Sequence, residues 1–462
     1  MRKIFYSFLL AAILLLPISA SRVRAQVSGP VYVVQSGDTL YSIALRFGIT
    51  VDDLISANQL ANPNQLAAGM ELVIPGLEGI TGKLVTETIP LGIDLPGLIR
   101  YRDLDLQTIL KLNHITSYAE VYAGSNLILP QTDTQIYRKP LPPLANGDNI
   151  LGHAAAANAN PWEMILAGEV PTSAHLQPGE VLFASSTEQV PPPNPLSPFV
   201  SEVSVDPLPL VQGHTFVIRV KTQPQITLQG SLNGSPLAFF PDGDNQFVAL
   251  QGIYAIAEPG LASFTLSAKN ADGSQMSFEQ MMLLQQGYYA QDPPLTVDPT
   301  TIDPANTKPE DDLIKQTTSP ATPDKMWDGI FKLPVDEPYC IKSWFGNRRS
   351  YNGGPYNYFH TGLDFGVCVD LNILAPAPGV VVFSGPLTVR GNATIINHGW
   401  GIYTGYWHQE KSLVKVGDRV ETGQVIGVIG GTGRVTGPHL HWEVWVNGIQ
   451  VEPQEWLDRA FP

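Results

Sequence analysis

The chain has 462 residues, more than one hydrophobic core holds, so we expect several domains. It contains 42 Asp and Glu against 27 Lys and Arg, which gives a formal net charge of −15. This excess argues against a surface that binds nucleic acid through its phosphates and against electrostatic binding to anionic polymers. A polymer partner should therefore be bound through sugar or peptide contacts.

The N-terminus has the order of a secretory signal. Two basic residues precede an apolar run at residues 4–18, and small residues follow with cleavage sites after Ala20 or Ala25. We assign residues 1–25 to the signal. The alternative, an uncleaved membrane anchor, is disfavoured because the apolar run is shorter than the roughly 18 residues of a full span. We expect a secreted or cell-envelope protein with no membrane span after signal cleavage.

Residues 30–76 have the pattern of a small βααβ unit. A strand at 31–34 is followed by helices at 40–47 and 51–58 and by a returning strand at 71–75. The stretch "YVVQSGDTLYSIALRFGITVDDLISANQLANPNQLAAGMELVIP" resembles the LysM family over nearly the full module. The resemblance implies binding to N-acetylglucosamine-containing glycans through two loops, which contain Ser36, Gly37, Asp38, Thr39, Ala61, Asn62 and Pro63.

Two further segments repeat this rhythm. Residues 80–131 end in "LKLNHITSYAEVYAGSNLILP" but lack the Gly-Asp-Thr-Leu turn, and residues 143–187 keep a Gly-Asp turn, a helix and a closing strand. Such self-similarity is typical of repeated modules. They look like a diverged and a degenerate LysM module, which either bind sugar or share only the fold.

The middle of the chain alternates linkers with strands. Residues 188–198 are proline-rich and predict a stiff extended linker. Residues 199–288 contain short alternating runs broken by turns, which predicts an Ig-like antiparallel β-sandwich, and residues 289–326 read as a second linker. The predicted fold class is therefore mostly β and multidomain: small βααβ modules, a sandwich, and a C-terminal antiparallel β domain.

Five of the nine histidines lie in the last 103 residues, and four of them fall in three short motifs. These are "FHTGLDFG", "YTGYWHQE" and "TGPHLHWEV". Side chains two apart on a strand share a face, so His439 and His441 should project into one groove. His398 stands apart at an expected hairpin turn, and we interpret it as structural.

The motifs supply the groups of a catalytic zinc site. Such a site takes three histidine or carboxylate ligands and leaves a fourth position open, and His360, Asp364 and His441 form such a set for one zinc per chain. The chain has no HExxH motif, so His408 and His439 remain as the base and as the stabiliser of the tetrahedral intermediate.

These residues also carry a family resemblance. Residues 327–458 resemble the lysostaphin-type (LytM-like) zinc endopeptidases, with "SWFGNRRSYNGG", "HTGLDFG", "APAPGVVVFSG", "VKVGDRVETGQVIGVIGGTGRVTGPHLHWEV" and "VEPQEWL" in the family's order. The resemblance implies the same ligands and catalytic histidines in a domain at 327–460. One departure is "WHQE", where relatives often have leucine after the histidine.

The sequence thus predicts an exported zinc metalloendopeptidase that hydrolyses peptide bonds in the stems or cross-bridges of peptidoglycan. Peptidoglycan is the expected partner, and LysM is expected to bind its glycan strand. The alternative is a catalytically silent wall-binding regulator of amidases, which would have eroded ligands. Cys340 and Cys368 form a disulfide, remain thiols, or give Cys368 a metal role. Three aromatic residues either pack in the domain or line a peptide cleft: Tyr403, Tyr406 and Trp442.

Overall fold

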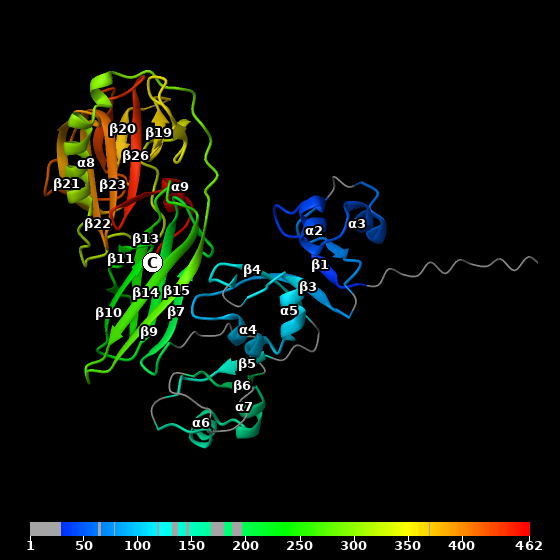
Figure 1. Cartoon of the computed structure of the whole chain (residues 1–462). Coiled ribbons are helices and arrows are strands. Elements are labelled where there is room, and N and C mark those ends of the chain that lie inside the picture. The colour runs from blue at the N-terminus through cyan, green and yellow to red at the C-terminus, as the bar shows by residue number, and fades with distance from the viewer. Residues whose placement is uncertain are drawn as a thin grey trace, which may run out of the picture. The chain divides into compact units, whose positions relative to one another are not determined.

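The computed structural model describes residues 29–62, 66–77, 79–117, 120–131, 137–144, 147–167, 180–186, 196–368 and 370–462. The expected signal, Pro63 and most of the proline-rich linker lie outside these residues. The chain divides into two compact units, Met1–Val85 with Pro130–Asp133, and Thr86–Leu129 with Thr134–Pro462. Figure 1 shows their elements. Among the described helices, none is long and apolar enough to cross a membrane.

The first unit contains the expected βααβ module. It consists of β1 (Val31–Val33), α2 (Leu40–Phe47), α3 (Val51–Asn58) and β2 (Glu71–Val73), with β1 antiparallel to β2. Thr39 and Thr50 are the N-caps of the two helices. Each side chain accepts a hydrogen bond from the backbone amide three residues later, and each completes a capping box. The apolar stripe of α2 is buried through Leu40, Ile43, Ala44 and Phe47.

Two more sets of helices and strands follow. The second has β3 (Lys83–Thr88), α4 (Leu95–Arg102), α5 (Leu106–Leu112) and β4 (Asn126–Gln131). The third has β5 (Tyr137–Pro140), α6 (Ile150–Ala157), α7 (Pro161–Ala167) and β6 (Phe183–Ser186), with β5 antiparallel to β6. Its first strand precedes residue 143, where we expected the module to begin, because the register pairs Tyr137 with Ser186.

The expected sandwich is present as two sheets. One sheet has the order β11-β10-β14-β15-β8 and the other β12-β13-β9-β7. Apolar residues from both sheets form one buried cluster. The strands are β7 (Val200–Asp206), β8 (Leu210–Val211), β9 (Thr215–Thr222), β10 (Thr227–Leu232), β11 (Ser235–Pro236), β12 (Phe240–Pro241), β13 (Gln246–Gly252), β14 (Gly260–Lys269) and β15 (Gln275–Gln285).

The C-terminal domain is built on one large sheet. Its main path runs β16-β19-β26-β23-β22-β21-β24; β20 and β25 pair with each other, β25 also joins β23, and β27 joins β26. A two-stranded pair and α9 (Pro453–Asp458) complete it. The strands are β16 (Ile341–Ser343), β17 (Arg348–Arg349), β18 (Tyr358–Phe359), β19 (Leu363–Gly366), β20 (Asn372–Leu374), β21 (Gly379–Leu387), β22 (Gly391–Gly399), β23 (Ile402–Ser412), β24 (Arg419–Val420), β25 (Val425–Ile429), β26 (His439–Val446) and β27 (Ile449–Val451).

The two faces of this sheet pack against different groups of residues. One face carries the main apolar core, which includes Phe365, Tyr406 and Trp442. Residues on the opposite face, among them Trp407 and Trp445, form a second cluster with Ile314. The functional groups described below lie on this second face, because Trp407 pairs with His441 across the sheet and paired residues share a face.

The segment at 289–326 differs from the linker that its composition suggested. It contains η3 (Pro299–Thr301) and α8 (Pro304–Thr318), and α8 buries Glu310, Ile314 and Thr318. In Figure 1 it runs from β15 along the C-terminal domain and returns as α8 beside the large sheet. The composition was misleading because only one face of the helix carries buried residues, while most of its other positions are polar residues or Pro.

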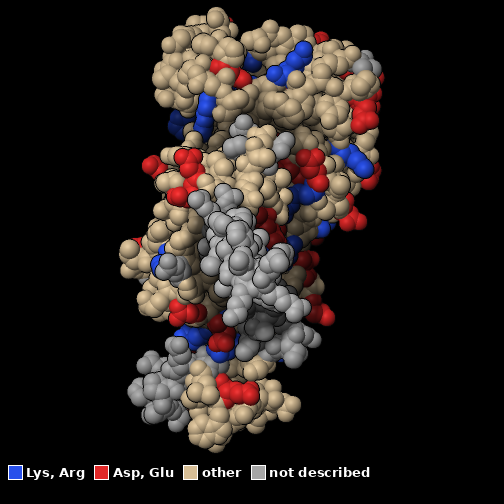
Figure 2. All heavy atoms as spheres, turned by 90° about the vertical axis from the view of Figure 1, so that its right-hand side faces the viewer, with Lys and Arg blue, Asp and Glu red and all other residues tan. Residues whose placement is uncertain are grey.

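Charged side chains occur at many places on one face of the molecule. Figure 2 shows Lys and Arg side chains interspersed with Asp and Glu over the face turned to the viewer.

Candidate metal centre

Three predicted ligands meet at one point on adjacent strands. Asp364 on β19 lies directly opposite His441 on β26 in the antiparallel register, and His360 precedes β19. Asp364 Oδ1 lies 2.8 Å from His441 Nδ1 and 2.9 Å from His360 Nε2, and the two ring nitrogens are 2.9 Å apart. All three residues are buried. The structure therefore brings together residues that are 77 and 81 positions apart.

Each of these three side chains has a further hydrogen-bond partner outside the group. His360 Nδ1 lies 2.8 Å from the carbonyl oxygen of Trp344, which can only accept, so Nδ1 carries the hydrogen and Nε2 the lone pair. His441 Nε2 lies 2.9 Å from Glu443 Oε1, which leaves its Nδ1 as the lone-pair nitrogen. Arg349 Nη2 lies 3.1 Å from the far oxygen of Asp364. Such outer partners are typical of metal-ligating histidines and carboxylates.

The electrostatics fit a bound cation. Burial lowers the pKa of His360 to about 4, so this imidazole is neutral at neutral pH. Burial would raise the pKa of Asp364, but His360 and His441 hold it well below its ordinary value, so the carboxylate is ionised. Burial would lower the pKa of His441, but the carboxylates of Asp364 and Glu443, which face its two ring nitrogens, raise it. A cation bound at Nδ1 would take the place of the proton that these carboxylates favour there. His360, Asp364 and His441 each direct one possible ligand atom to the same buried point, and this group fits a metal ion.

His408 reaches the site through a β-bulge that the motif did not reveal. Tyr406 pairs with Thr394 and Gln409 pairs with Asn392, so Trp407 and His408 both oppose the single residue between Asn392 and Thr394. Regular alternation would place His408 on the face opposite Trp407. The extra residue and the positive φ of 62° at His408 turn its ring toward the site instead. Its centroid lies 4.9 Å from that of the His439 ring and 6.1 Å from that of His441.

Backbone carbonyls fix the tautomers of both remaining histidines. His408 Nδ1 lies 2.8 Å from the carbonyl oxygen of Thr432, and His439 Nδ1 lies 2.7 Å from that of Gly437. Each Nδ1 therefore donates, and each Nε2 keeps a lone pair. His439 Nε2 lies 3.6 Å from Asp364 Oδ1, so the expectation that His439 and His441 share a face is confirmed. Burial holds the pKa of His408 well below its ordinary value.

A groove of about 1080 Å³ contains this constellation. Its lining includes Asp364, His408, His439 and His441, and side chains from outside the motifs such as Tyr254 of the sandwich. The three aromatic residues that could have lined a cleft are packed instead, since Tyr403, Tyr406 and Trp442 are buried in the two clusters of the sheet.

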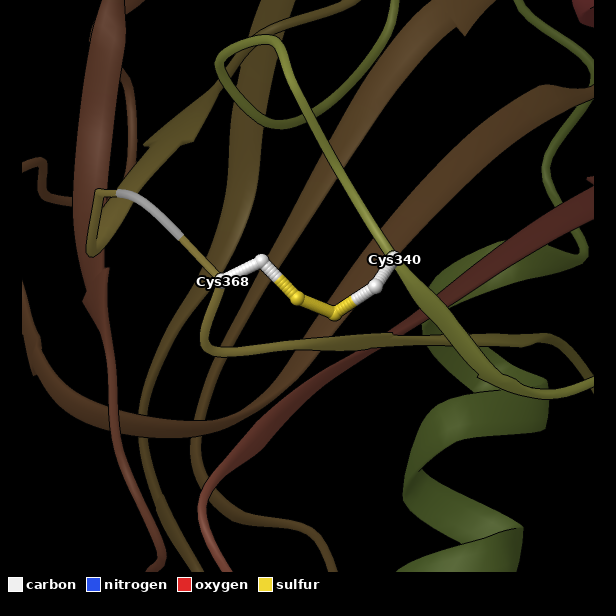
Figure 3. Close-up of a disulfide and its surroundings, with 2 residues drawn as sticks. All are labelled: Cys340 and Cys368. Atoms are coloured by element: carbon white, nitrogen blue, oxygen red, sulfur yellow. A yellow bond between two sulfur atoms is a disulfide. The ribbon is translucent and has the colours of Figure 1, made fainter.

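The other singled-out residues of this domain have structural surroundings. His398 is fully buried between the carbonyl oxygen of Pro378 and the Thr404 hydroxyl. Cys340 and Cys368 are joined by a disulfide (Figure 3), so neither is a free thiol.

In the first LysM-like module, two of the candidate glycan residues also shape their own loop. Asp38 accepts hydrogen bonds from the Tyr32 hydroxyl at 2.7 Å and the Gln35 amide at 2.8 Å, and Thr39 caps α2. Ser36 and Gly37 complete this turn, Ala61 and Asn62 follow α3, and Pro63 lies outside the described residues.

The fold and the site define the class: a mostly β protein whose C-terminal sheet carries two histidines and a carboxylate that could bind a metal, with two further histidines beside them. Comparison with known proteins gives the family of each part. Residues 358–453 match peptidase family M23, and residues 32–75 and 100–130 match the LysM domain. The chain thus carries an M23 peptidase domain and LysM domains, and the M23 match implies a metal cofactor.

The curated relatives align over about a quarter of this chain. The chain is 39% identical over 128 residues to the peptidoglycan DD-endopeptidase ShyA of Vibrio cholerae and 47% identical over 114 residues to ShyC of the same organism. These alignments cover 28% and 25% of this chain, and 30% and 26% of the relatives. A solved M23 peptidase of Pseudomonas aeruginosa shares 25% identity with a TM-score of 0.41, over 55% of this chain and 96% of that one.

Sequence reasoning missed the residues that support the ligands. Glu443 and Arg349 lie inside the quoted motif segments, but neither was predicted as a supporting residue, and nothing in the spacing of Arg349 marks it as a partner of Asp364. The signal that could have found Glu443 is its position two residues after His441 on a strand, which places both side chains on one face.

Proposed function

We propose that this chain is an exported zinc metalloendopeptidase that hydrolyses peptide bonds in peptidoglycan and is held on the wall glycan by its LysM modules. The observation that carries the proposal is the convergence of His360, Asp364 and His441, with His408 and His439 beside them. Two imidazoles and one carboxylate are the ligand set of a catalytic zinc with an open position.

The residues beside the ligands suit proton transfer. Zinc bound at His360, Asp364 and His441 would polarise the scissile carbonyl and lower the pKa of water. His408 is neutral because burial lowers its pKa, and its Nε2 lone pair accepts a proton from the attacking water. Once protonated, the same nitrogen donates toward the leaving amine. His439, oriented by the Gly437 carbonyl, lies beside His408 and would stabilise the oxyanion that develops on the scissile carbonyl.

The substrate follows from the relatives and the binding modules. ShyA and ShyC are named peptidoglycan DD-endopeptidases, so we assign the cleaved bond to the D,D type in peptide cross-links. LysM modules on the glycan strand would raise the local substrate concentration without requiring tight binding in the groove. The N-terminal signal pattern and the Cys340–Cys368 disulfide both favour an oxidising compartment outside the cytoplasm.

The test is zinc content and muropeptide release by the purified full chain. We expect about one zinc per chain and new peptide termini in digested peptidoglycan, identified by mass spectrometry. Asp364→Ala should lose zinc and hydrolysis while glycan binding persists, and His408→Ala should keep zinc but lose hydrolysis. Asp328→Ala, at an exposed position, is the matched control.

Two results would contradict the proposal. Hydrolysis retained in Asp364→Ala would remove the ligand assignment. A wild-type chain that binds no zinc and cleaves no peptidoglycan would favour the regulator of amidases.

A further inference from the structure

The segment at residues 290–318 is here called the strap. It contacts residues that support the candidate metal ligands and residues that support His408, although it lies outside the M23 match at 358–453. It begins as an extended chain beside β17. The Asp292 amide donates to the Arg348 carbonyl at 3.0 Å and the Leu295 amide to the Ser350 carbonyl at 2.9 Å. These backbone bonds fix the strap along the edge from which Arg349 projects.

At the metal-ligand end, the contact is made by Asp292. Its Oδ2 lies 3.2 Å from Arg349 Nε, and its Oδ1 accepts from Asn347 Nδ2 at 2.7 Å. Arg349 Nη2 in turn bonds the far oxygen of Asp364 at 3.1 Å. The guanidinium is thus held between two carboxylates, with only 15% of its side chain exposed. This arrangement leaves Asp364 Oδ1 free to face His360 and His441.

At the proton-transfer end, the contact is made by Glu310 on α8. Its carboxylate accepts from the backbone amides of Val389 at 2.8 Å and Arg390 at 3.1 Å, and from Arg390 Nη1 at 2.8 Å. Only 4% of the Glu310 side chain is exposed. Burying a carboxylate is costly unless donors surround it, and these three bonds satisfy it.

The turn at Val389 and Arg390, which is hydrogen-bonded to Glu310, is connected to His408 by two sets of hydrogen bonds. The Arg390 carbonyl accepts the His408 amide at 2.8 Å, where the chain has its positive φ. The Val389 carbonyl accepts the Arg434 amide at 2.8 Å, which anchors the loop whose Thr432 carbonyl fixes His408 Nδ1. Moving this turn therefore moves both the backbone and the ring of His408.

We propose that the strap is a working part of the catalytic site, in which Asp292 positions Asp364 through Arg349 and Glu310 positions His408 through Arg390. This inference rests on the proposed peptidase function for its kinetic half only. Asp292 and Glu310 are positioning residues that do not touch substrate. If the strap only covered the groove, weakening its contacts would raise activity, whereas our proposal expects activity to fall.

The test compares Asp292→Asn and Glu310→Gln in the full chain, with Asp312→Asn on the exposed side of α8 as the control. Zinc affinity is measured by competition with a chromophoric chelator, and kcat and KM with cross-linked muropeptide dimers. We expect Asp292→Asn to weaken zinc about 10-fold, in the range of outer-partner losses. We expect Glu310→Gln to bind zinc as the wild type does, to lower kcat about 10-fold and to leave KM within about twofold.

Each outcome decides the matter. Wild-type zinc affinity in Asp292→Asn overturns the first half, and unchanged or raised kcat in Glu310→Gln overturns the second. If Glu310→Gln does not fold, Glu310→Asp keeps the charge and shortens its reach, and the same kcat loss is expected. The zinc measurement needs no substrate, so it stands even where the wild-type chain fails to cleave peptidoglycan and the proposed function itself is wrong.

Discussion

Replacing Glu443 by Gln should weaken metal binding although Glu443 is not a ligand. Its Oε1 accepts the His441 Nε2 hydrogen at 2.9 Å, and its side chain is 1% exposed. Burial would raise the pKa of Glu443, but His441, Arg390 and Thr361 lower it, so the bond to His441 is charge-assisted. That charge makes His441 a stronger ligand and fixes which ring nitrogen faces Asp364.

The magnitude follows from the kind of bond that is lost. A hydrogen bond to a charged group contributes about 1.5–3 kcal/mol and a neutral one about 0.5–1.5 kcal/mol. Glutamine keeps a neutral acceptor of the same shape, so the loss is about 1–1.5 kcal/mol, or about 5- to 13-fold in the zinc dissociation constant.

The assay is zinc competition with a chromophoric chelator at fixed pH. Glu410→Gln is the matched control, because it removes the same charge from an exposed position near the end of β23. The reasoning is refuted if Glu443→Gln and Glu410→Gln bind zinc with the same affinity.

Two further predictions concern stability. Burial lowers the pKa of His398 from 6.5 to about 4, so the stability that depends on its neutral form is present above pH 6.5 and is lost as the pH falls to about 4. Between pH 6.5 and about 4, the free energy of unfolding of the His398→Gln variant should fall by about 3 kcal/mol less than that of the wild type, because glutamine does not titrate. Urea unfolding across this pH range measures the difference, and the same pH dependence in both proteins would contradict the prediction. The disulfide closes a loop of 28 residues, so Cys340→Ala with Cys368→Ala should cost roughly 3–4 kcal/mol and lower the Tm. Reductant should lower the wild-type Tm and leave the double variant unchanged; equal Tm values before reduction would count against the estimate.

The sequence predicted the candidate ligand set because the chemistry of these residues is encoded locally. His360 and Asp364 stand four residues apart, and His439 and His441 alternate on one strand, so a short motif specifies both the donor types and their common face. LysM was also recognisable, since its capping threonines and apolar stripe lie within one short module.

The position of His408 was beyond such reasoning. Its ring faces the site only because a bulge adds one residue opposite β22, and a bulge depends on the pairing of two strands rather than on the sequence of one. A count of alternating positions from Tyr406 would have placed His408 on the wrong face.

The sequence by itself determined the modular order of the chain, the mostly β class and the residues of the candidate metal centre, because each depends on periodicity or spacing within a few residues. Only the tertiary structure decided what holds those donors in place. Asp292 and Glu310 lie in a stretch whose composition indicated a linker, yet backbone pairing and one buried helix face bring them to Arg349 and Arg390. Such contacts between distant residues follow from packing and cannot be read from local pattern.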